Sequence, residues 1–137
     1  MKGLKLGALL SAIVCSFPVA AIAQTNSTDS AYLNDLYSFL QSEDTITYTM
    51  ATQSMSPADS VWAAQMFCDT FSSGVDPADA YAVYTSAAIG QGETYGAHFT
   101  EEIAYAIGLY GGAVMNLGAA HYCPQHQQKV QQALNAL

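Results

Sequence analysis

The segment AHYCPQHQQ, residues 120–128, decides how the whole chain is interpreted, because it places one cysteine between two histidines. Cys123 belongs either to a disulfide or to a metal site with His121 and His126. A zinc site needs four converging ligands, with Cys68 as the fourth, but the paired C-x-x-C spacing of structural zinc sites is absent. We therefore expect a disulfide between Cys68 and Cys123 and no metal ligands, and metal binding through the two histidines stays open as an alternative.

The first residues predict export. Lys2 and Lys5 precede a short apolar run, and a small-x-small sequence of the kind that signal peptidase recognises ends at Ala23. Cleavage after Ala23 would leave residues 24–137 as a single domain in the periplasm or outside the cell. Cys15 would leave with the peptide, so the mature chain keeps two cysteines, which an oxidising compartment is expected to join.

The charge balance narrows the possible partners. The chain has three basic and eleven acidic residues, and after cleavage Lys129 is the only basic residue, for a formal net charge of −10. Such a chain lacks the cations that phosphate backbones and anionic lipid surfaces attract, so nucleic-acid binding is excluded. We expect no membrane-spanning helix in the mature chain, because no later segment has an apolar run long enough to cross a membrane.

Apolar residues at helical spacing predict an all-α domain, a small bundle of four to five helices. Thr28 or Asp29 should cap the first helix, and Ser56 and Asp76 each precede a proline at a first helical position. Residues 45–55 alternate in polarity with no second strand to pair with, which indicates an extended connection. The expected helices cover about residues 30–42, 57–72, 77–90, 101–122 and 130–137.

No motif supports catalysis. The glycine-bearing segments lack the Lys-Ser/Thr pair of a phosphate-binding loop, and no serine lies in a G-x-S-x-G sequence. His98, near Glu93 and Tyr95, is the only acid–base grouping worth naming. Glu101 and Glu102 follow a predicted cap at Thr100, where carboxylates favour the positive end of the helix dipole.

The spacing of these elements resembles a known family. YLNDLYSFL (residues 32–40) leads to MFCDTFSSG (66–74), and an apolar helix ends in YCPQ (122–125). Over about residues 31–128 this is similar to the domain-of-unknown-function family numbered 732. The resemblance implies a helical, exported domain closed by Cys68 and Cys123, and it brings no activity. Ala64 and Gln65 stand where the family commonly has glycine, which leaves the closeness of helix packing beside Cys68 open.

These observations favour a non-enzymatic exported module that binds a protein or a component of the cell envelope and needs no cofactor. Three alternatives come from other classes of protein. They are a metal-binding protein using His121 and His126, an acid-stress periplasmic chaperone, and a hydrolase centred on His98.

Overall fold

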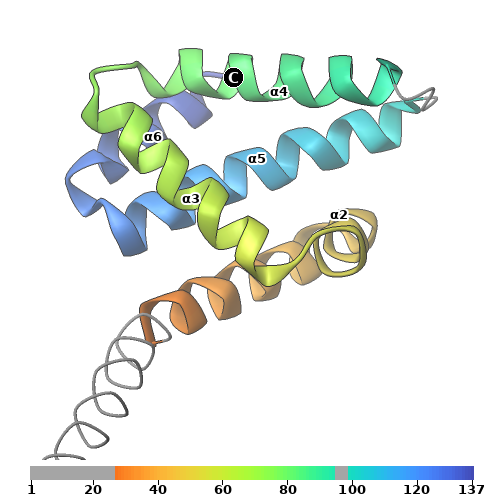
Figure 1. Cartoon of the computed structure of the whole chain (residues 1–137), viewed down its shortest axis with the longest axis horizontal. Helices are drawn as coiled ribbons and strands as arrows, with labels where there is room; N and C mark the ends of the chain where they lie inside the picture. Colours follow the sequence, from red (N-terminus) through yellow and green to blue (C-terminus); the bar gives the residue numbers. More distant parts are fainter. Residues whose placement is uncertain (1–26, 95–98) are drawn as a thin grey trace, which may run out of the picture.

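A computed structural model describes residues 27–94 and 99–137, which form six α-helices and no strand. The all-α prediction is confirmed, and the helix count exceeds the expected four to five (Figure 1). The predicted signal peptide and its cleavage site lie outside the described residues. The elements are an N-terminal helix over residues 27–43, α2 (Thr45–Thr49), the π-helix η1 (Met50–Ser54), α3 (Pro57–Ser72), α4 (Pro77–Thr94), α5 (Glu101–Tyr122), the 3₁₀-helix η2 (Pro124–His126) and α6 (Gln127–Asn135).

The central element is α5, against which α2, α3, α4 and α6 all pack (Figure 1). Tyr110, Val114 and Met115 on this helix are almost completely enclosed. Gly118 allows α3 to come close, because a Cβ there would lie 2.8 Å from the Cβ of Ala64. The close helix packing beside the disulfide therefore depends on a glycine of α5 rather than one of α3.

By length and hydropathy alone, α5 would also qualify as a membrane-spanning helix, contrary to the sequence-based expectation. Half of its apolar window is buried inside the fold, and α3, α4 and α6 cover it. A core helix passes the same test because both environments select apolar side chains.

The N-terminal helix buries Tyr32, Leu36 and Leu40 at a spacing of four residues. Its residues 28 and 29 are already helical, so the expected cap at Thr28 or Asp29 is wrong. Asp29 instead accepts a hydrogen bond of 2.6 Å from the hydroxyl of Tyr122, which fastens this helix to the end of α5.

Residues 45–54 are helical, so the predicted extended connection is also wrong. The Asp44 carboxylate accepts hydrogen bonds from the backbone N–H of Thr47 at 2.8 Å and from its hydroxyl at 2.6 Å, which starts a helix. The buried residues are Thr47 and Ala51, one helical turn apart, while Ile46 is exposed. Of the alternating residues that suggested a strand, Tyr48 and Met50 are only partly buried against the core, and Ile46 faces away from it.

The caps of α3 and α4 lie where the sequence predicts them. Ser56 and Asp59 form a reciprocal capping box, and the Asp76 carboxylate accepts a hydrogen bond of 2.9 Å from the N–H of Ala78. The predicted end of α4 at Gly90 is wrong, since the helix continues to Thr94. A glycine inside a helix costs about 1 kcal/mol in helix propensity, which α4 tolerates at Gly90. The Thr94 hydroxyl donates a hydrogen bond of 2.9 Å to the carbonyl of Gly90.

Candidate functional site

Cys68 and Cys123 form a disulfide. Cys68 on α3 and Cys123 after α5 are bonded, with their Cα atoms 5.8 Å apart, and both are buried. The predicted pairing is confirmed. A disulfide leaves no thiolate to bind a metal, so Cys68 cannot be the fourth ligand of the zinc site considered above.

The two histidines have separate partners. His121 Nε2 lies 2.7 Å from a carboxylate oxygen of Asp35, and its ring meets the edge of Tyr32. His126 lies 3.4 Å from the Ser72 hydroxyl and packs edge-on against the ring of Phe71, so it is half-buried rather than fully exposed. Among the described residues, no group of three or more His, Cys, Asp and Glu side chains is arranged to hold a metal ion.

The possible acid–base grouping of the sequence falls mostly outside the described residues. His98 and Tyr95 lie there, and Glu93 is an exposed residue near the end of α4. Glu101 and Glu102 occupy the first turn of α5 behind the Thr100 cap, as predicted. No catalytic arrangement can be built from the described part of this group.

The buried hydroxyl groups form a structural network. Tyr32 donates to the carbonyl of Ser60 at 3.0 Å, and the Ser60 hydroxyl lies 2.8 Å from that of Tyr110. Burial is the main cause that raises the pKa of Tyr32 and of Tyr110, so both stay protonated in neutral solution. These groups hold the N-terminal helix, α3 and α5 together and are closed to a substrate.

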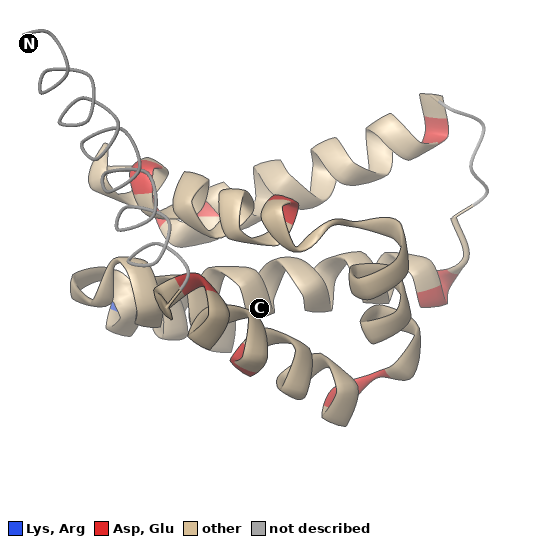
Figure 2. Ribbon diagram, turned by 60° about the horizontal axis from the view of Figure 1, so that its bottom comes forward, with Lys and Arg blue, Asp and Glu red and all other residues tan. Residues whose placement is uncertain are grey.

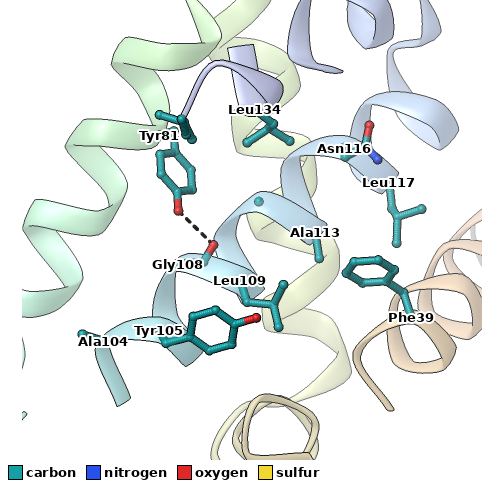
Figure 3. Close-up of a pocket in the computed structure, with 12 residues that line it drawn as sticks. Phe39, Tyr81, Ala104, Tyr105, Gly108, Leu109, Ala113, Asn116, Leu117 and Leu134 are labelled. Atoms are coloured by element: carbon teal, nitrogen blue, oxygen red, sulfur yellow. Dashed lines mark hydrogen bonds between the residues drawn. The ribbon is translucent and has the colours of Figure 1, made fainter. Parts of the chain in front are cut away.

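An apolar groove runs along one face of α5, and we call it the α5 groove (Figure 3). It has a volume of about 510 Å³, within the range of small-molecule sites. Tyr81 of α4 forms one wall, where its hydroxyl donates to the Gly108 carbonyl at 3.1 Å. Phe39 of the N-terminal helix faces Ala113 and Leu117 from the other side. The lining residues are Phe39, Tyr81, Ala104, Tyr105, Gly108, Leu109, Gly112, Ala113, Asn116, Leu117, Leu134 and Leu137.

The groove retains unused binding capacity. Tyr105 and Leu137 are 59% and 72% exposed, so large apolar surfaces stay in contact with water. Within the described part of the chain, the Asn116 Oδ1 is the only buried side-chain nitrogen or oxygen without a hydrogen-bond partner. This oxygen is closed to solvent, so the exposed side chains of Tyr105 and Leu137 are the ones that a ligand could cover.

Sequence reasoning missed this groove, although a signal for it exists. The lining residues of α5 recur in adjacent pairs every four positions, and one row consists of Ala104, Gly108, Gly112 and Asn116. Small side chains in such a row leave a hollow along the helix. Whether a neighbouring helix fills that hollow depends on how α4, α6 and the N-terminal helix are placed, which the row itself does not show.

The charged residues lie outside the lining. Figure 2 shows acidic residues spread over several helices, and Lys129 is the only lysine or arginine among the described residues. Lys129 lies 3.4 Å from a carboxylate oxygen of Asp76. The described surface is therefore almost uniformly anionic.

Comparison with known proteins found no family model that matches the chain, and no significantly similar curated protein or solved structure. The resemblance to the family numbered 732 accordingly stays a prediction.

Proposed function

We propose that this chain is an exported, non-enzymatic binding module whose α5 groove receives the apolar part of a protein or envelope component. The groove is the observation that carries the proposal. It combines about 510 Å³ of space with an apolar lining in which the large side chains of Tyr105 and Leu137 stay exposed. Burying apolar ligand surface there would contribute about 25 cal/mol per Å² before the costs of association.

The test is titration with N-phenyl-1-naphthylamine, an uncharged fluorophore whose emission rises in apolar surroundings. We expect saturable binding at a single site of the mature protein. Gly112→Leu should weaken this binding at least about tenfold, because the new side chain fills the groove, where a Cβ meets its nearest neighbour at an ordinary 3.6 Å.

Gly90→Leu is the matched control, since Gly90 is also helical, has no atom within 4 Å of its added Cβ and lies outside the groove. It should bind the dye as the parent protein does. Tyr105→Ala provides a second groove variant whose folding does not depend on the change, because Tyr105 is 59% exposed. Equal binding by both groove variants and the control, or no saturable binding at all, would overturn the proposal.

A further inference from the structure

The α5 groove ends at the first turn of α5, beside two carboxylates. Glu101 precedes Tyr105 by four residues and Gly108 by seven, which places it on the helix face that lines the groove. Glu102 precedes Tyr105 by three residues and Leu109 by seven, with the same consequence. Both carboxylates are exposed, and neither forms an ion pair with another described residue.

A third carboxylate belongs to the opposite wall. Glu43 follows Phe39 by four residues, so it lies on the same face of the N-terminal helix one turn further along. It is exposed and has no ion-pair partner among the described residues. A carboxylate thus follows the groove-lining Phe39 on the N-terminal helix, in addition to the two at the first turn of α5.

Positive groups near the rim do not offset this charge. The macrodipole of α5 contributes roughly half a positive charge at its first turn, against two full negative charges on Glu101 and Glu102. Lys129 is paired with Asp76 and does not line the groove. The net field at this end of the groove is negative.

The shape of the groove favours a narrow, elongated ligand. Its lining extends along α5 from Ala104 to Leu117, roughly 20 Å at 1.5 Å per residue. Tyr81 and Leu134 lie beside Gly108 and Gly112 and form one side of this strip, and Phe39 stands on the other side, so a ligand would lie between these two walls. No charged side chain lines this length.

We propose that the α5 groove binds a single-chain amphiphile with a positively charged end. This inference rests on the groove function proposed above. The hydrocarbon chain lies along α5 between Tyr81 and Phe39, and the charged end lies at Glu101 and Glu102. An anionic amphiphile would be repelled by these carboxylates, which are part of a formal charge of −10 on the mature chain, and should bind weakly.

The test compares three amphiphiles that share one dodecyl chain and differ in the charge of the head group. Dodecyltrimethylammonium, dodecyl maltoside and dodecyl sulfate are each titrated, below their micelle concentrations, against N-phenyl-1-naphthylamine bound to the mature protein. The ammonium compound should displace the dye at about a tenfold lower concentration than the maltoside, and the sulfate should be the weakest of the three.

Two double variants locate the origin of the preference. Glu101→Gln/Glu102→Gln should bring the affinity for the ammonium compound close to that for the maltoside, which itself should not change. Asp69→Asn/Asp79→Asn removes the same number of charges from exposed positions that do not line the groove, and should keep the preference. Of the three affinities, only that for the ammonium compound should fall as the salt concentration is raised.

Failure of the ligand inference and failure of the groove function would give different results. Equal affinities for the three head groups, or an equal loss of preference in both double variants, would overturn the inference about the ligand and leave the groove function in place. Displacement that is unaffected by Gly112→Leu would overturn both proposals, because the amphiphiles would then bind elsewhere.

Discussion

Asn116 carries an unsatisfied buried acceptor beside the α5 groove. Its buried Oδ1 has no partner, and an unsatisfied buried acceptor costs about 1–3 kcal/mol. We expect Asn116→Leu to raise the free energy of unfolding by about 1 kcal/mol, because the side chain keeps its size and loses the unsatisfied group. The same variant should bind N-phenyl-1-naphthylamine as the parent protein does, because this oxygen is closed to solvent and cannot contact the dye.

Chemical denaturation and dye titration of the same samples check both halves of this prediction. Asn34→Leu on the exposed side of the N-terminal helix is the control and should change neither quantity. A variant at Asn116 that lost stability would show that the amide is a structural group.

Gly118 tests the contact between α3 and α5. A Cβ at this position would lie 2.8 Å from the Cβ of Ala64 and 3.2 Å from its Cα, and backbone atoms cannot move aside easily. Gly118→Ala should therefore lower the free energy of unfolding by about 1–3 kcal/mol, as overpacking does in tight cores. Gly90→Ala, where nothing lies within 4 Å, should instead gain up to about 1 kcal/mol in helix propensity.

Adding Ala64→Gly to the Gly118→Ala variant removes the atom that lies closest to the new Cβ. The double variant should recover part of the lost stability in urea or thermal unfolding. If Gly118→Ala and Gly90→Ala proved equally stable, α3 and α5 would not be in the close contact described.

Among the elements, α3 and the end of α5 are the pair joined covalently. The disulfide closes a loop over a sequence separation of 55 residues, which in the chain-entropy model stabilises the fold by about 4 kcal/mol. Cys68→Ser/Cys123→Ser should lower the free energy of unfolding by a comparable amount, measured against the parent with and without reductant. Alkylation of both cysteines in unreduced mature protein would contradict the pairing.

The elements that sequence predicted well are those whose boundaries carry local chemistry. Ser56 and Asp76 start helices through hydrogen bonds within three or four residues, and Pro124 follows the last helical residue of α5 by two positions. The errors came where tertiary packing decides. Residues 45–54 turn Thr47 rather than Ile46 toward the core, and α4 passes through Gly90 because no local group stops it.

The candidate site could be predicted only in part for the same reason. The disulfide was predicted from the two cysteines that remain if the chain is exported and cleaved as expected, which needs no three-dimensional information. The α5 groove depends on how far Tyr81 of α4 and Leu134 of α6 reach over Gly108 and Gly112, and on Phe39 standing at its edge. Those are relations between distant elements, and a single sequence contains no direct measure of them.

At the scale of the whole molecule, acidification acts through the helix starts. Hydrogen bonds to their carboxylates, mainly from Thr47, Ser56 and Ala78 respectively, lower the pKa values of Asp44, Asp59 and Asp76. The unfolded chain therefore binds protons more readily than the folded one. The stability that these groups contribute is fully present above the ordinary aspartate pKa of about 4, and is lost as the pH falls through the lower folded values.

We therefore expect the melting temperature to vary little between about pH 7 and pH 5 and to fall below about pH 4. Relief of repulsion among the eleven acidic residues opposes this fall, but that charge is spread over several helices, whereas α2, α3 and α4 each lose a cap. In Asp44→Asn/Asp59→Asn/Asp76→Asn the amide oxygens keep capping and no longer titrate, so the acid loss should shrink, while Asp69→Asn should leave it unchanged. Circular dichroism melts across this range test the prediction, since an equal loss of stability in acid in the triple variant would assign that loss to other groups.

The alternative function of an acid-stress chaperone adds one condition. The protein loosened by acid would have to prevent client aggregation better at about pH 3 than at pH 7.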